Sequence, residues 1–145
     1  MKLTPTLRAI LATAALSLTT AIAIARSTEL QEPPRTEVVL ADNTKASTLA
    51  TVRRAIIAGG ARHGWRPVAD KPGVMTLSVS SNGHKVTVDV LYDAKSFQVK
   101  YKESSDMNEE RSGDKIKVHP KVNKWLDDLN EDIRGAAVVG VGTAN

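Results

Sequence analysis

Two stretches of the chain carry apolar residues at helical spacing. The first is predicted to be a helix over residues 47–63, with Ser47 as its N-cap. It should stop at Gly64, which can take a left-handed conformation, and Trp65 should fold back onto the last turn. Its apolar stripe consists of Leu49, Val52, Ala55, Ile56 and Ile57.

The second stretch follows His119 and has Pro120 at the first helical position, where proline is favoured. It is predicted to be an amphipathic helix that ends at Gly135. Trp125 lies at the centre of the stripe and is expected to bury against a sheet. The stripe consists of Val122, Trp125, Leu126, Leu129 and Ile133.

Between the helices, residues 74–81, 84–92 and 97–101 alternate apolar and polar positions, which predicts three strands. Asn82-Gly83 predicts a two-residue hairpin turn, because a type I′ turn needs positive φ at both positions. Residues 93–96 form the next turn. With these turns all the apolar positions share one face, and a slip of one residue would break that agreement. These positions are Met75, Leu77, Val79, Val86, Val88, Val90, Tyr92, Phe97, Val99 and Tyr101.

The same register defines the opposite face of the sheet, which is predicted to be solvated. Asp89 falls opposite Lys100, and Thr87 falls opposite Lys102, which leaves Lys102 unpaired. Lys100 and Lys102 are therefore the candidate partner-binding residues, for an acidic partner or anionic lipid headgroups. The alternative is a solubilising and edge-protecting role for both lysines.

These elements predict an α+β fold class: a three-stranded antiparallel meander with an N-terminal and a C-terminal helix packed on one face. Residues 47–134 form this single α-β-β-β-α domain. Residues 26–46, which contain Pro33-Pro34, are expected to be a linker, and residues 135–145 a flexible tail. Whether Glu37–Leu40 adds a short edge strand stays open.

Residues 1–25 have the layout of a secretory signal peptide. Lys2 and Arg8 precede an uncharged apolar run, and Ala23-Ile24-Ala25 fits the small-x-small cleavage pattern before Arg26. A periplasmic or secreted product is therefore expected. The alternative is a retained membrane anchor, although hydroxyl residues interrupt the run that a bilayer span of about 20 apolar residues requires.

Composition narrows the class of protein. The chain has 145 residues, 41% of them hydrophobic, which suits one soluble domain. Without Lys2 and Arg8 the net charge falls from +4 to +2. With export, this small charge makes nucleic acid an unexpected partner, and no stable membrane span is expected after signal cleavage. The absence of cysteine excludes disulfides, thiolate metal sites and a lipid-modified cysteine.

Candidate chemical groups all have local structural explanations. His63, His84 and His119 sit at element ends, and their spacing matches no metal motif, so no metal or cofactor is predicted. Ser104-Ser105 lacks the glycines of a nucleophile elbow. The acids of the second helix should face water; they are Asp127, Asp128, Glu131 and Asp132. The aromatic residues are expected in the core, with an aromatic ligand-binding cluster as the alternative.

The order of motifs resembles a group of small exported proteobacterial proteins, many of them lipoproteins without an assigned function. The likeness covers Leu49 to Arg134 and implies a compartment and a fold but no reaction. This chain has no cysteine at the cleavage site, so lipid anchoring is not implied. The matching residues are Gly64-Trp65, Gly83-His84, Val88, Tyr92-Asp93, Tyr101-Lys102-Glu103-Ser104-Ser105, Lys121, Asn123-Lys124-Trp125 and Leu129 to Ile133.

These observations predict an exported periplasmic protein that is not an enzyme and acts as an interaction or structural module of the envelope. Its partner is an envelope macromolecule of unknown identity. By fold analogy, the alternative is a PepSY-like inhibitor or propeptide-type binding module. A further alternative is a small-ligand carrier or an enzyme of unrecognised type, which a preformed apolar pocket with converging polar groups would favour.

Overall fold

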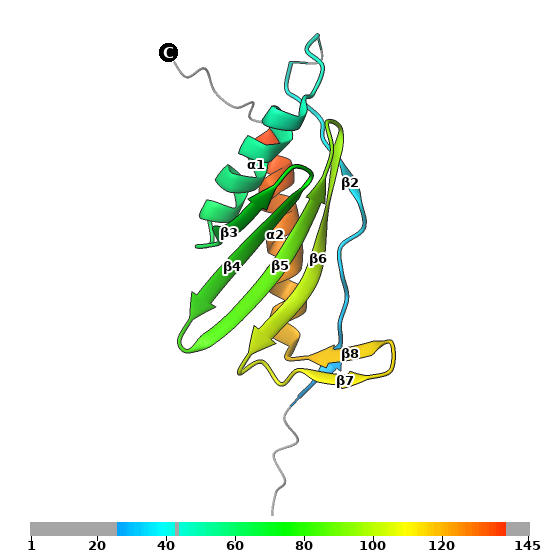
Figure 1. Ribbon diagram of the computed structural model, residues 1–145, viewed down its shortest axis with the longest axis vertical. Coiled ribbons are helices and arrows are strands. Elements are labelled where there is room, and N and C mark those ends of the chain that lie inside the picture. Colours follow the sequence, from blue (N-terminus) through cyan, green and yellow to red (C-terminus); the bar gives the residue numbers. More distant parts are fainter. Residues whose placement is uncertain (1–25, 43, 139–145) are drawn as a thin grey trace, which may run out of the picture.

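The computed structural model describes residues 26–42 and 44–138 and contains two helices and two antiparallel sheets (Figure 1). The predicted signal peptide, residues 1–25, lies outside the described residues, as do residues 139–145 of the predicted tail. Helices α1 (Leu49–Ala61) and α2 (Pro120–Val138) cover the same face of the larger sheet.

The larger sheet has five strands in the order β2-β6-β5-β4-β3. The smaller sheet has three strands in the order β1-β8-β7 and lies beside the N-terminal end of α2 (Figure 1). The strands of the larger sheet are β2 (Thr36–Glu37), β3 (Arg66–Lys71), β4 (Val74–Ser81), β5 (His84–Tyr92) and β6 (Ser96–Ser105). Those of the smaller sheet are β1 (Thr28–Glu29), β7 (Glu110–Ser112) and β8 (Lys115–Val118).

The predicted fold class, a three-stranded meander with two helices, is wrong. The meander is the centre of a five-stranded sheet, and a second sheet accompanies it. The missing strands carry no clean alternation. β3 contains Pro67 and is exposed throughout, while β1 and β2 have two residues each. Strands this short are held by neighbours distant in sequence, so periodicity does not reveal them.

The predicted register of the first hairpin is confirmed along its whole length. Val79 lies opposite Val86, and Leu77 lies opposite Val88. Asn82 and Gly83 have φ angles of 51° and 81°, as the type I′ turn requires. The strand side chains predicted to face inward form the core with most of the two helix stripes. Leu49 of the predicted first stripe is an exception, because it is 42% exposed.

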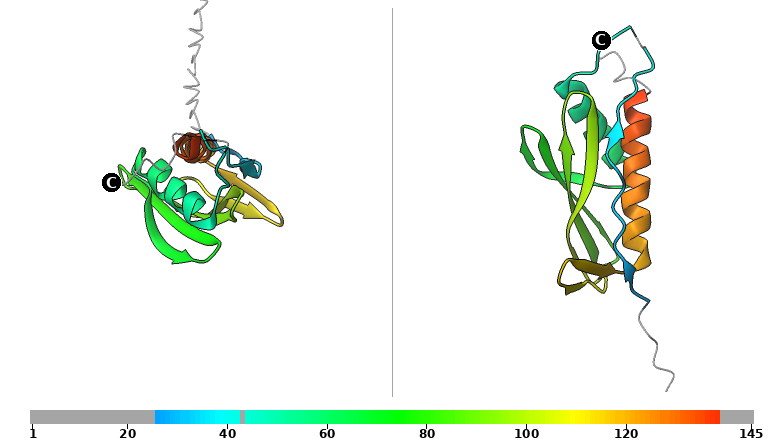
Figure 2. Two further views of the ribbon diagram at one scale, coloured as in Figure 1. Left: turned by 90° about the horizontal axis from the view of Figure 1, so that it is seen from above. Right: turned by 90° about the vertical axis from the view of Figure 1, so that its right-hand side faces the viewer.

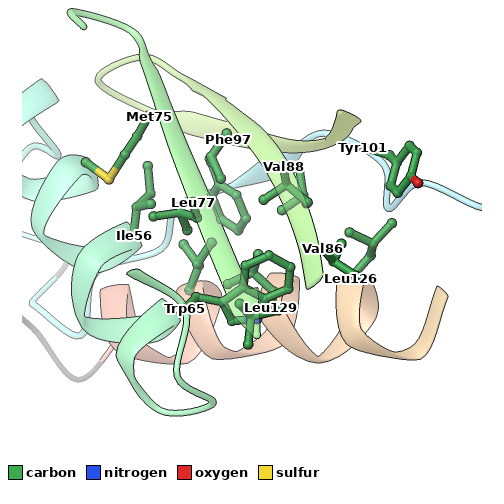
Figure 3. Close-up of a cluster of buried hydrophobic side chains, with 14 of the residues drawn as sticks. Ile56, Trp65, Met75, Leu77, Val86, Val88, Phe97, Tyr101, Leu126 and Leu129 are labelled. Carbon is green, nitrogen blue, oxygen red and sulfur yellow. The ribbon is translucent and has the colours of Figure 1, made fainter. Parts of the chain in front are cut away.

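Figure 3 shows how that core is assembled. The side chains of Ile56 from α1 and of Leu126 and Leu129 from α2 point toward the sheet. Ile56, Leu77, Val88, Phe97, Leu126 and Leu129 are all fully buried.

The helices approach one another closely at Gly59. A Cβ atom built there would lie 2.6 Å from the backbone N and Cα of Ile133 in α2. Real Cβ atoms are essentially never found so close to another atom, so a glycine is needed at this crossing. Gly59 thus admits the backbone of α2, whereas a Cβ at the neighbouring Gly60 would face the side chains of Trp65 and of Leu77 in the sheet.

The start of α1 and the end of α2 both differ from the prediction. Thr48, not Ser47, caps α1, its hydroxyl accepting from the N–H of Thr51 at 3.2 Å. The α2 helix does not end at Gly135 but continues to Val138. Ala136 and Ala137 are buried there, and this packing outweighs the weak helix propensity of one glycine.

Residues 28–38, here called the strap, run along the side of β6 that faces away from β5, and beside α2 (Figure 2). Thr36 and Glu37 pair with β6, and Thr28 and Glu29 pair with β8. The predicted linker, residues 26–46, thus contributes a strand to each sheet.

Candidate functional site

A recess with two tryptophans in its lining lies where the turn after α1, strand β4 and the first half of α2 meet. This recess, the tryptophan cleft, has a volume of about 350 Å³. It is lined by His63, Trp65, Val79, Ser81, Lys124, Trp125 and Asp128.

Local sequence determines where Trp65 stands. Gly64 has a φ angle of 79°, and the Trp65 N–H donates to the Gly60 carbonyl at 3.0 Å while the Gly64 N–H donates to the Ala61 carbonyl. These two bonds form a Schellman motif, which turns Trp65 back as predicted. Its side chain is only 3% exposed and lies with Leu77 and Leu129 (Figure 3).

Trp125 differs from the prediction, because it is only partly buried. The fully buried positions of α2 are Val122, Leu126, Leu129 and Ile133, and Trp125 lies at the border of that stripe. Its indole therefore packs against the core on one side and lines the cleft on the other.

Charged side chains of both signs surround the cleft, and they are paired. Lys124 donates to Asp128 Oδ2 at 2.6 Å, one helical turn away. His63 Nδ1 lies 2.5 Å from Asp132 Oδ2. Asp132, expected to face water, has a side chain only 17% exposed because it also lies beside Arg62.

Lys100 and Lys102 lie on the outer face, the side of the sheet opposite the helices. Both are engaged by carboxylates of the same chain. Lys100 donates to Glu32 Oε2 of the strap at 2.5 Å, and Lys102 Nζ lies 3.8 Å from Asp89 Oδ2. The expectation that Lys102 remains unpaired is therefore wrong.

A β-bulge explains this change of partners. The predicted pair Asp89–Lys100 is present in the backbone register, but Thr87 lies opposite Glu103 instead of Lys102. The register shifts between Thr87 and Val88, and β6 carries one extra residue there. No turn residue announces this bulge in the sequence.

The outer face is also less solvated than predicted. Thr76 and Thr87 are both buried on it. The Thr76 hydroxyl donates to Asp89 Oδ1 at 2.6 Å, and Thr87 donates to Ser78 at 3.4 Å. Its hydroxyl groups are thus largely satisfied within the sheet.

The three histidines each have a partner within the chain. His84 Nδ1 lies 2.7 Å from the Asp106 carbonyl, which it can reach only as a donor. His119 Nδ1 accepts from the Lys121 N–H at 3.1 Å and so caps the start of α2. Among residues 26–42 and 44–138, no three His, Asp or Glu side chains cluster closely enough to hold a metal ion.

Two pronounced pKa shifts lie away from the cleft, at the strap side of the sheet. The backbone N–H of Lys95, the Arg35 guanidinium and the backbone N–H of Ser96 lower the pKa of Asp93 to about 2. Burial raises the pKa of Tyr101 to about 12, and its hydroxyl donates to Ser104 at 2.6 Å. Both groups have structural partners, so neither indicates acid–base chemistry.

The sequence located part of the cleft. Both tryptophans and His63 were marked by the helix stop and the helix stripe, and an aromatic ligand-binding cluster was an alternative to core packing. For Val79 and Ser81 the sequence predicts only a strand, because no pattern of neighbouring residues indicates that the end of β4 lies beside α2.

Comparisons with protein families, with curated proteins and with solved structures found no match to this chain. Within the described residues, neither helix combines the length and the apolar character that crossing a membrane requires.

Proposed function

We propose that this chain is an exported periplasmic protein without catalytic activity, which acts by binding a macromolecule of the cell envelope through the tryptophan cleft. Export rests on the signal-peptide pattern of residues 1–25. Binding rests on a single observation: a concave recess in which a partly buried tryptophan meets polar groups. Tryptophan is enriched at interfaces because its ring is apolar and its N–H is polar.

The cleft is a better contact surface than the outer face. Lys100 and Lys102 each face a carboxylate of their own chain, so an anionic partner would have to displace Glu32 or Asp89. At the cleft, by contrast, the Trp125 ring is not fully covered by this chain.

The concave shape also supports the alternative of a small-ligand carrier. Ligand pockets usually measure about 300–1,000 Å³, and the cleft falls at the lower end of that range. A carrier would take up a free small molecule, whereas the proposed function requires contact with an envelope macromolecule.

Site-specific photo-crosslinking in living cells tests the proposal. A photo-reactive residue is placed at Lys124 on the cleft rim, at Lys102 on the outer face, or at Lys45 as a control, which precedes α1 and so lies at the end of that helix opposite the cleft. We expect crosslinked products from position 124 alone, in the periplasmic fraction, from a chain whose first residue is Arg26. Products from 102 alone would assign contact to the outer face, and an N-terminus at Met1 would remove the export step.

A further inference from the structure

The tryptophan cleft combines an apolar wall with a polar rim. The apolar wall is formed chiefly by the partly buried Trp125, with the largely buried Trp65 and Val79 beside it. The rim carries His63, Ser81, Lys124 and Asp128. A ligand that fills such a site must itself have an apolar face and a hydrogen-bonding edge, because polar groups left without partners on binding weaken affinity.

The charges of the rim disfavour an ionic ligand. Lys124 is paired with Asp128, and Asp132, which contacts His63, also lies beside the Arg62 guanidinium. A cation attracted by Asp128 meets Lys124 beside it, and an anion attracted by Lys124 meets Asp128. A neutral ligand faces neither penalty and can use both members of the pair, one as a donor and the other as an acceptor.

We propose that the tryptophan cleft binds a neutral sugar ring of an envelope glycan. A pyranose ring has one face of C–H groups, which can lie against an indole. It also has an edge of hydroxyls, which can donate to Asp128 and accept from Lys124 or Ser81. This assignment rests on the proposed function for its location, while the chemistry rests on the cleft alone.

The chain provides its own reporter for this site. It contains two tryptophans, Trp65 and Trp125, and both line the cleft. Any change in tryptophan fluorescence on adding a ligand therefore reports on a residue that lines the proposed site, and the variants below assign where the ligand binds.

The test titrates the mature protein with three neutral trisaccharides, built respectively from N-acetylglucosamine, α-linked glucose and β-linked glucose. We expect a saturable fluorescence change with at least one of them that is unchanged by raising the salt concentration, because no net charge is involved. Inorganic phosphate and a small polyamine serve as ionic probes. No saturable change with any trisaccharide, or a response only to an ionic probe, would overturn the proposal.

Variants assign the binding to the cleft. Trp125→Ala should weaken trisaccharide binding at least tenfold, measured by calorimetry, and Trp125→Phe should restore part of it. Ser81→Ala, at an exposed strand end, should weaken it with the fold intact. Lys102→Ala on the outer face is the matched control and should bind like the parent. If the Trp125→Ala and Ser81→Ala variants both bound the trisaccharide as tightly as the parent, the sugar would bind elsewhere and the assignment would be refuted.

Two sources of the sugar are separated by a sedimentation assay. Retention on purified cell-wall glycan that is competed by the trisaccharide indicates a polymeric ligand, while trisaccharide binding without retention indicates a free oligosaccharide. Failure of the sugar proposal is also distinguishable from failure of the proposed function. Crosslinks from position 124 to an envelope protein, without sugar binding, would refute this inference alone. Sugar binding by a chain that is not exported would refute only the proposed function.

Discussion

The two edges of the five-stranded sheet are finished in different ways. At the β6 edge the strap covers the strand, whereas at the other edge β3 is exposed along its whole length. An uncovered edge offers unpaired backbone groups to other chains, so both need protection. The strap covers one edge, whereas the residues of β3 make the other edge unfavourable for pairing with a further strand.

Side chains hold the strap in place in addition to its backbone pairing. Glu32 accepts from the Tyr101 N–H at 2.9 Å and so satisfies an edge donor with a carboxylate. Asn123 of α2 donates to the Glu29 carbonyl and accepts from the Gln31 N–H, both at 2.9 Å. The strap is therefore attached to the sheet and to a helix at once.

The β3 edge is protected by composition. Pro67 lacks a backbone donor, and the register with β4 shifts between Pro67 and Ala69. Val68 at the shift is 61% exposed, and the strand also carries the charged residues Arg66, Asp70 and Lys71. One sheet can therefore combine an edge that is covered by a segment of its own chain with an open edge that resists pairing with other chains.

The largest effect on stability, against which the effects at the two edges can be compared, is expected where α1 and α2 cross. Gly59→Ala should destabilise the fold by about 3 kcal/mol or more, because its Cβ would meet the α2 backbone. Gly60→Ala, whose Cβ would meet the Trp65 side chain at 3.2 Å, should have a smaller effect. Urea denaturation measures both, and equal effects would contradict the close crossing.

Removing the strap should break the covered edge. Deletion of residues 26–38 removes Leu30 and Val38, both partly buried against the core, and should lower the free energy of unfolding by about 2–4 kcal/mol. The bare β6 edge should also promote self-association, detectable by sedimentation. Unchanged stability and a monomeric state would mean that the strap is a passive linker.

Asn123→Ala tests how the strap is attached. Loss of two hydrogen bonds should cost about 1–2 kcal/mol and speed amide exchange at Gln31. Asp127→Ala, an exposed substitution on the same helix, is the control and should change neither quantity. Equal exchange rates at Gln31 in the parent and in Asn123→Ala would contradict the attachment.

The pH dependence of the covered edge follows from Asp93, which binds Arg35 of the strap at 2.8 Å. Its pKa is about 2 in the folded chain and about 3.9 when unfolded. Because the folded value is lower, the stabilisation by Asp93 is complete above about pH 5 and is lost as pH falls toward 2. The difference in urea midpoint between the parent and Asp93→Asn should shrink over that window. A difference that is constant from pH 7 to pH 2 would contradict this assignment.

The smallest effect on stability is expected at the open edge. Pro67→Val should change the free energy of unfolding by no more than about 0.5 kcal/mol, since the residue is exposed. It should nevertheless increase self-association at high concentration, because it restores a backbone donor at the edge. A variant that stays monomeric would show that the register shift alone protects β3.

Local chemistry determined the centre of this protein. The alternation of Leu77, Val79, Val86 and Val88, with Asn82-Gly83 between them, specifies a register, because a one-residue slip would expose the core face. The α2 stripe and the Schellman turn at Gly64 are likewise specified by residues close in sequence.

Tertiary structure decided the edges and the candidate site. The strap pairs through strands of two residues whose partners lie more than 50 positions away, so no local period reveals it. The bulge in β6, whose extra residue is Lys102, brought this lysine close to Asp89. The border position of Trp125 left its ring at a cleft whose other wall comes from the turn after α1 and from β4. Periodicity reports which neighbours share a face, whereas these features depend on which distant faces meet.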